Sequence, residues 1–202
     1  YLFILLIVFI VVYIGLSFHI TNLSIKATKK TSEQLPSSNG MQYEDIQFRT
    51  SDKLLLKGWF IENSNLQTVI MIHGVDSNKS DGFILELIKD IYDMGYSVMA
   101  FDLRAHGDSE GSDLGLTYVE RDDISSAINY LENTKNIEEI VLFGFSYGAT
   151  IALSNTDLSP SIKGIVSDSP FYDLPELLAT EVSNRTFIHK FIANLLKFGI
   201  IQ

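Results

Sequence analysis

A short sequence in the second half of the chain, residues 144–148 (Gly-Phe-Ser-Tyr-Gly), places the tightest constraint on the fold. The apolar run before it, 140–143, is typical of a buried strand, and the small residues after it suit a closely packed helix. A serine at the tip of a strand-to-helix turn adopts strained backbone angles, and Gly144 and Gly148 remove the Cβ atoms that would collide across the turn. A helix that begins at Tyr147 points its first N–H groups at the turn, where they can stabilise a developing oxyanion. The alternative is a glycine-rich turn in which Ser146 has no chemical role.

The core predicted for residues 41–170 begins with a hairpin of two antiparallel strands, 43–49 and 54–61. After the hairpin, apolar runs that predict buried strands alternate with patterns that predict helices. The strands are expected at 68–72, 97–101, 140–143 and 162–166, and the helices at 81–94, from 117 and from 147. Thr117 and Glu120 have the spacing of a capping box at the start of the second helix. This order predicts an α/β fold with a doubly wound, mostly parallel sheet.

Residues 1–18 are almost wholly apolar, and no Lys, Arg, Asp or Glu precedes Lys26. About 20 such residues are enough to cross a bilayer as a helix. A signal peptide would need an Ala-x-Ala-like cleavage site and a soluble core helix would need a polar face, and neither is present. The pattern predicts an N-terminal transmembrane anchor over residues 1–23, followed by a polar linker over residues 24–40.

The composition of the chain argues against several other classes of protein. The 202 residues carry a net charge of −10 and no basic cluster beyond Lys26, Lys29 and Lys30, which argues against nucleic acid as a partner. Cysteine is absent, which excludes disulfides, thiolate metal sites and a cysteine nucleophile. The four histidines lack the spacing of metal ligands, so no metal is expected.

Three loops follow the carboxyl ends of successive predicted strands, where open α/β sheets place their sites. They are 73–76, 102–111 and the turn at Ser146. In this order they resemble the α/β-hydrolase family, and the match is most similar to bacterial membrane-anchored serine hydrolases of the esterase or acylpeptidase type. The resemblance covers roughly Tyr43 to Phe171. It implies a serine hydrolase that cleaves an ester, thioester or amide of a small-molecule or peptide substrate through an acyl-enzyme, without a cofactor.

The resemblance also implies roles for individual residues. Ser146 corresponds to the nucleophile, and the backbone N–H groups of Val75 and Tyr147 correspond to an oxyanion hole. His73 corresponds to a residue that braces its loop, because the base of the family follows the serine in sequence. The segment 102–111 is expected to support the site from below; the alternative is that its polar side chains act in the chemistry. The supporting residues together are His73, Gly74, Asp102, Arg104, His106, Gly144 and Gly148.

The acid and base of the expected triad have no plain counterpart in the sequence. In the family, an acid and then a histidine follow the serine, each at the end of a later strand. Asp168, at the end of the next predicted strand, and His189, in an apolar helical pattern over 187–198, are the candidates within the chain. We interpret residues 171–202 as the start of a cap or lid that packs over the sheet, lines an acyl pocket or touches the membrane. The chain is therefore expected to be incomplete at both ends and inactive by itself, with the last strands of the fold and the triad acid and base beyond Gln202.

Two other functions compete with a serine hydrolase. One is a catalytically silent, membrane-anchored binding module that keeps the fold without the triad. The other is a haloperoxidase or dehalogenase, which is disfavoured because dehalogenases of this fold carry Asp at the position of Ser146. The lysines after the anchor favour a cytoplasmic domain by the positive-inside rule, whereas the resemblance to surface hydrolases favours an extracytoplasmic one, which is our prediction.

Overall fold

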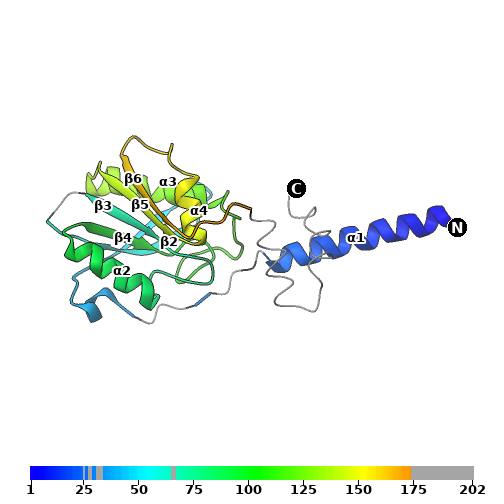
Figure 1. The fold of residues 1–202 in the computed structure, drawn as a ribbon, viewed down its shortest axis with the longest axis horizontal. Coiled ribbons are helices and arrows are strands. Elements are labelled where there is room, and N and C mark those ends of the chain that lie inside the picture. Colours follow the sequence, from blue (N-terminus) through cyan, green and yellow to red (C-terminus); the bar gives the residue numbers. More distant parts are fainter. Residues whose placement is uncertain (25, 27–28, 31–33, 65–66, 174–202) are drawn as a thin grey trace. The chain divides into compact units, whose positions relative to one another are not determined.

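The computed structural model describes the chain except for residues 25, 27–28, 31–33, 65–66 and 174–202 (Figure 1). The chain falls into two units: one comprises Tyr1–Lys26, which contains α1 (Leu2–Ser24), together with Phe171–Gln202, and the other is the compact unit Ala27–Pro170. None of the helices in the described residues combines the length and the apolar character that a membrane span requires. The transmembrane helix predicted for residues 1–23 is therefore not supported.

One sheet organises the compact unit. Its strands in the described residues are β1 (Glu44–Arg49), β2 (Leu55–Ile61), β3 (Thr68–Ile72), β4 (Ser97–Phe101), β5 (Ile140–Phe145) and β6 (Ile162–Asp168). They lie in the order β1-β2-β4-β3-β5-β6. β1 pairs antiparallel with β2, and so does β2 with β4, whereas β3 pairs parallel with both β4 and β5, and β5 pairs parallel with β6. The predicted hairpin and the mostly parallel sheet of an α/β fold are confirmed.

Helices cover both faces of this sheet. Figure 1 shows α2 (Gly82–Asp93) on one face, and α3 (Glu120–Tyr130) and α4 (Tyr147–Leu153) on the other. The chain moves in opposite directions along the sheet after β3 and after β4, so right-handed crossovers put the connecting helices on opposite faces. This is the predicted doubly wound arrangement. Two short helical turns, η1 (Pro36–Asn39) and η2 (Leu131–Lys135), lie before β1 and after α3.

The helix α2 packs on the sheet as its sequence pattern predicts. The Asp81 carboxylate caps its N-terminus by accepting a hydrogen bond of 3.2 Å from the Phe83 N–H, and Gly95, with a φ of 98°, follows its last turn. Its buried residues join a core cluster that includes Val69 and Met71, alternate residues of β3. Those residues of α2 are Ile84, Leu85, Ile88 and Ile91. Every residue of β3 is buried, as expected for a strand covered on both faces.

The start of α3 differs from the predicted capping box. Val119 occupies the N-cap position without a side-chain hydrogen bond, and Thr117 has a positive φ of 69°. The Glu120 carboxylate is buried, where it accepts hydrogen bonds from the Gly115 N–H and the Tyr147 hydroxyl. The prediction is wrong because the spacing of Thr117 and Glu120 carries no information about polar partners elsewhere in the chain. Glu120 instead turns inward to the Tyr147 hydroxyl.

The close approach of α4 to β3 leaves no room for a side chain at Gly148. A Cβ there would lie 2.2 Å from the Ile72 carbonyl oxygen. We predict that Gly148→Ala lowers the free energy of unfolding by about 2 kcal/mol or more, because α4 must move away from the sheet. The matched control is Gly164→Ala in β6, where the nearest atom, Cγ2 of Val141, would be 3.7 Å from the new Cβ. That change should stay within about 1 kcal/mol. Chemical denaturation measures both variants, and equal losses would contradict this account of the packing.

Candidate active site

The loops that follow β3 and β5 meet at the carboxyl edge of the sheet. Ile72, the last residue of β3, pairs with Gly144 of β5, so the two strands end at nearly the same level. Gly74 lies beside Ser146, because a Cβ on Gly74 would be 3.5 Å from the Ser146 Cβ. β4 runs parallel to β3, which brings the loop that begins at Asp102 to the same edge. The structure therefore gathers the three loops that the sequence singles out.

Ser146 has a strained backbone conformation between β5 and α4. Its φ is 51° and its ψ is −110°, and sparsely populated angles of this kind cost a non-glycine residue about 1–3 kcal/mol. The Ser146 N–H donates a hydrogen bond of 2.8 Å to the Asp168 carbonyl, which attaches the turn to the end of β6. Gly144 allows the turn to close, since a Cβ there would lie 2.1 Å from the Gly148 carbonyl oxygen. The predicted strand–turn–helix is confirmed, with the serine side chain partly exposed.

Two backbone positions beside Ser146 suit the stabilisation of an oxyanion. Tyr147 is the next residue and the first of α4. Val75 follows Gly74, the residue that lies against Ser146, and its side chain is exposed. The first N–H groups of a helix point out of its N-terminus, where negative charge is favoured. The arrangement suits a carbonyl oxygen that gains charge while a nucleophile attacks its carbon.

The His73 imidazole braces the loops after β3 and β4. Its Nδ1 donates a hydrogen bond of 2.7 Å to the Gly74 carbonyl, and its Nε2 accepts one of 3.1 Å from the Leu103 N–H. The side chain is buried, and its ring packs edge-on against the His106 ring, with 4.9 Å between the ring centres. Burial, with a smaller contribution from the charge of His106, lowers the pKa of His73 to about 4. Both ring nitrogens serve the backbone, which agrees with the bracing role and not with that of a base.

A buried ion pair holds the loop after β4. The Asp102 carboxylate accepts hydrogen bonds from the Lys79 N–H at 2.8 Å, the Lys79 Nζ at 2.6 Å and the Asp108 N–H at 2.9 Å. Lys79 Nζ also forms an ion pair with the Asp108 carboxylate at 2.7 Å. Asp102 and Lys79 are both buried. These bonds fasten the loop after β3 to the loop after β4, so Asp102 has a supporting role in the site.

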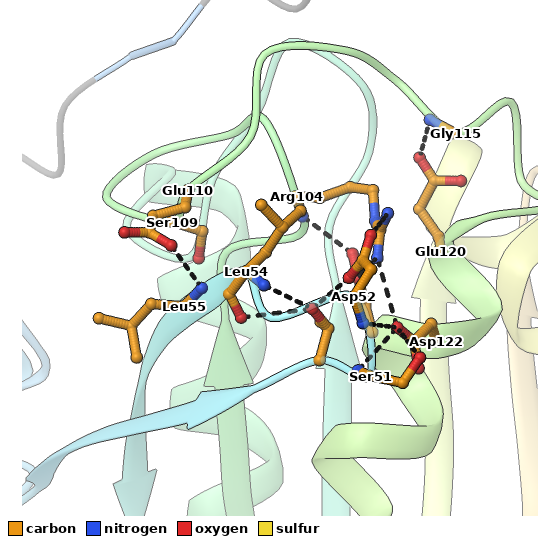
Figure 2. Close-up of polar contacts among 12 residues, drawn as sticks. Ser51, Asp52, Leu54, Leu55, Arg104, Ser109, Glu110, Gly115, Glu120 and Asp122 are labelled. Carbon is orange, nitrogen blue, oxygen red and sulfur yellow. Dashed lines mark hydrogen bonds and ion pairs between the residues drawn. The ribbon is translucent and has the colours of Figure 1, made fainter.

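Arg104 links three segments that are far apart in the sequence (Figure 2). Its guanidinium donates to the Asp123 carboxylate of α3 through Nε at 2.9 Å and Nη2 at 2.7 Å, and to Asp52 of the β1–β2 turn through Nη1 at 3.0 Å. In the same turn, the Ser51 N–H and hydroxyl donate to Asp122 at 2.9 Å. Burial acts to lower the pKa of Arg104, but the hydrogen bonds and charges of Asp123 and Asp52 outweigh it and raise that pKa. Arg104 is therefore a structural cation beneath the site.

His106 lies deeper in the same loop. Its Nδ1 donates a hydrogen bond of 2.9 Å to the Arg104 carbonyl, and burial is the main cause that lowers the pKa of His106. Among the described residues, two buried side-chain atoms have no hydrogen-bond partner: Nε2 of His106 and Oε2 of Glu120. Because His106 is fully buried, it supports the loop and cannot reach a substrate at Ser146.

Comparison with known proteins assigns the chain to a family. A family model described as serine aminopeptidase, S33, matches residues 63–198, which is more than half of the chain. The chain belongs to this family of α/β hydrolases. The match begins before β3 and includes each of the three loops at the carboxyl edge.

Solved and curated relatives of this hydrolase agree with the family. The esterase Pf2001 of Pyrococcus furiosus has a TM-score of 0.75 and 27% identity, over 86% of this chain and 67% of that chain. The uncharacterized protein YqkD of Bacillus subtilis is 28% identical over 160 residues, or 77% of this chain and 48% of the relative. The uncharacterized membrane protein YNL320W of Saccharomyces cerevisiae is 32% identical over 124 residues, or 58% and 42%. The hydrolase chain thus spans about half the length of the curated relatives it matches.

Among the described residues, no acid–base pair lies at Ser146 of the hydrolase. Asp168 ends β6, where its exposed carboxylate accepts a hydrogen bond of 2.8 Å from the Ser169 hydroxyl. His189 and most of the predicted cap lie outside the described residues. No group of histidine and carboxylate side chains suited to a metal ion occurs in the part of the chain that is described.

Three residues of the hydrolase site were missed at the level of sequence. Lys79 holds Asp102, Glu120 holds the Tyr147 hydroxyl, and Phe83 of α2 packs its half-exposed ring 5.1 Å from the ring of Phe145. The aromatic pair forms apolar surface next to Ser146. The one sequence signal for Lys79 is its place in the connection between β3 and α2. The signal at Glu120 is its spacing from Thr117, which instead predicts a helix cap.

A cleft of about 590 Å³ lies beside β1 and β2. Its lining includes Trp59, Lys57 and Lys79 but not Ser146, Val75 or Tyr147. The candidate active site of the hydrolase is therefore the carboxyl edge of the sheet and not this cleft.

The buried state of His73 leads to a prediction about pH. The pKa of His73 is about 4 in the folded protein, whereas a histidine in an unfolded chain has a pKa of about 6.5. Between these values the unfolded chain binds more protons, so the free energy of unfolding should fall as the pH is lowered, by up to about 1.4 kcal/mol per pH unit. Urea denaturation at pH 7 and pH 5 should show a shallower dependence for His73→Gln, which lacks the titrating ring. The same pH dependence in both proteins would exclude a buried neutral His73.

Proposed function

We propose that this α/β hydrolase is a serine hydrolase that cleaves an ester, thioester or amide through an acyl-enzyme on Ser146. The observation that carries the proposal is the strained φ of 51° at Ser146, at the tip of the turn from β5 to α4. Strained residues persist where the surrounding structure enforces their angles, and they cluster at functional sites. The similarity to a solved esterase supports the same class of reaction.

The proposed reaction proceeds in two halves. The Ser146 Oγ forms a bond to the carbonyl carbon of the substrate while a histidine takes the hydroxyl proton. The electron pair of the carbonyl double bond moves to the oxygen, where the N–H groups of Val75 and Tyr147 stabilise its charge. The tetrahedral intermediate then expels the leaving group, which takes the proton from the histidine. Water attacks the acyl-enzyme by the same route and releases the acid product and the free serine.

Fixed backbone donors suit the proposed oxyanion hole. Gly148 packs against the carbonyl of Ile72, so α4 is held against the end of β3 before any substrate arrives. Donors that are already in place require no reorganisation when charge develops, and loss of one such donor costs a rate factor of about 10²–10³. The aromatic rings of Phe83 and Phe145 offer apolar surface for the acyl group beside the serine.

The general base is proposed to lie outside the described residues. His73 is excluded because both of its ring nitrogens bond to the backbone, and His106 is excluded because it is fully buried. His189, which is not among the described residues, satisfies the proposal. Asp168 would supply the acid only with His189 as the base.

The nucleophile assignment predicts the effect of one substitution. Ser146→Ala in the full-length protein should reduce the hydrolysis of p-nitrophenyl acetate by at least about 10³-fold, because no other group forms the acyl-enzyme. The matched control is Ser154→Ala at the other end of α4, where the hydroxyl donates to the Thr150 carbonyl. The control should stay within twofold of the wild type (about 0.4 kcal/mol). Hydrolysis that survives Ser146→Ala would refute the proposal, and no hydrolysis by any of the proteins would favour a silent binding module.

We also propose that the N-terminal segment attaches the protein to a membrane, with the hydrolase unit outside the cytoplasm. Large apolar side chains of α1, among them Leu2, Phe3, Phe9 and Phe18, are exposed. One relative, from yeast, is named a membrane protein.

The attachment is tested by fractionation of cells. The wild-type protein should sediment with membranes and resist carbonate extraction, whereas a variant that lacks residues 1–31 should not. Protease added to intact cells should cleave the hydrolase unit. Wild-type protein of unchanged mass in the fraction without membranes would refute the attachment.

A further inference from the structure

The side chain of Tyr147 points into the protein, although its backbone stands at the proposed oxyanion hole. Only 3% of Tyr147 is exposed. The phenol oxygen donates a hydrogen bond of 2.7 Å to Glu120 Oε1 and accepts one of 2.9 Å from the Thr117 N–H. Burial, reinforced by the Glu120 carboxylate, raises the pKa of Tyr147, so the phenol keeps the proton that it donates. Two bonds to segments outside α4 therefore hold the residue that follows Ser146.

Burial of the Glu120 carboxylate costs free energy of folding, and packing alone does not offset that cost. It is fully buried at the start of α3, and its Oε1 accepts from both the Tyr147 hydroxyl and, at 2.7 Å, the Gly115 N–H, a bond visible in Figure 2. Its Oε2 has no hydrogen-bond partner among the described residues. A buried carboxylate with an unsatisfied oxygen costs more free energy than an apolar side chain of the same size. The arrangement therefore favours a role other than packing.

The loop before α3 is shaped around this carboxylate. A Cβ on Gly115 would lie 2.5 Å from Glu120 Oε2, so only glycine leaves space for the carboxylate there. Leu116 and Thr117 both have positive φ, 54° and 69°, which is uncommon for residues with a Cβ. This strained conformation presents the Thr117 N–H to the Tyr147 hydroxyl. The strained loop and the buried carboxylate thus both hydrogen-bond to the Tyr147 hydroxyl.

We infer that Glu120 is a positioning residue which, through the Tyr147 hydroxyl, orients the Tyr147 backbone N–H toward the oxyanion; the inference rests on the proposed function. The helix α4 has seven residues, and Tyr147 is the first, so the two hydrogen bonds of its hydroxyl help to hold the first turn of α4, where this N–H lies. The N–H acts only when charge develops, so its misalignment should slow the chemical step and leave substrate binding unchanged.

Four variants of the full-length protein test the inference. Tyr147→Phe removes the hydroxyl and Glu120→Ala removes its acceptor, and each should lower kcat for a p-nitrophenyl ester about tenfold with KM unchanged within twofold, short of the loss of a whole donor. Affinity for a trifluoromethyl ketone, which forms a tetrahedral adduct, should fall by the same factor. Combining both changes should cause no further loss, because they break the same link. Glu120→Gln, which keeps an acceptor oxygen, should restore most of the activity.

The control is Tyr130→Phe, since Tyr130 is a partly exposed tyrosine of α3 that packs on Phe48. It should match the wild type in both measurements. A folded Tyr147→Phe with wild-type kcat and wild-type affinity for the ketone would overturn the inference, as would losses confined to KM. If Glu120→Ala fails to fold, Tyr147→Phe decides alone. Activity that survives Ser146→Ala overturns the proposed function together with this inference, whereas its loss beside a fully active Tyr147→Phe overturns the inference only.

Discussion

The close approach of α4 to β3 and β5 is the constraint on which the rest of the candidate site depends. At Gly144 and Gly148 the backbones come so near that a single Cβ would overlap carbonyl oxygens. The turn between the two glycines closes with Ser146 at positive φ, and the Ser146 N–H is held by the Asp168 carbonyl of β6. The position of the serine is therefore a result of sheet and helix packing, which is much stiffer than the conformation of a surface loop.

Buried polar contacts beneath the carboxyl edge turn three separate loops into one support. His73 joins the loops after β3 and β4, the Lys79–Asp102 pair joins them a second time, and Arg104 ties them to the hairpin turn and α3 (Figure 2). Removing two charges from water costs about as much as their attraction returns, so such pairs add little net stability. We interpret them as contacts that select one conformation of the loops. The hydrogen bond between Glu120 and Tyr147 holds the start of α4 in the same way.

Local patterns in the sequence were sufficient for the sheet, its doubly wound connections and the turn at Ser146. Apolar runs located β3 and β4, and the two glycines located the turn, because short-range packing imposes those patterns. The contacts beneath the site were not predictable in this way: Glu120 and Tyr147 are 27 positions apart, and Lys79 and Asp102 are 23 apart. For Glu120 the local reading of a helix cap was wrong, because a distant hydroxyl competes for the carboxylate. The predicted membrane span was not supported, and the triad acid and base stay predictions.

The central claim is that the strained serine of this α/β hydrolase is its nucleophile. Its most direct test is to react the full-length protein with a fluorophosphonate, digest it and locate the adduct by fragment-ion mass spectrometry. The account predicts one phosphonyl group per chain, on Ser146, although Ser154, Ser159 and Ser161 lie within the next 15 residues. An adduct on another residue would contradict it, and so would an unmodified Ser146 in protein that still hydrolyses esters.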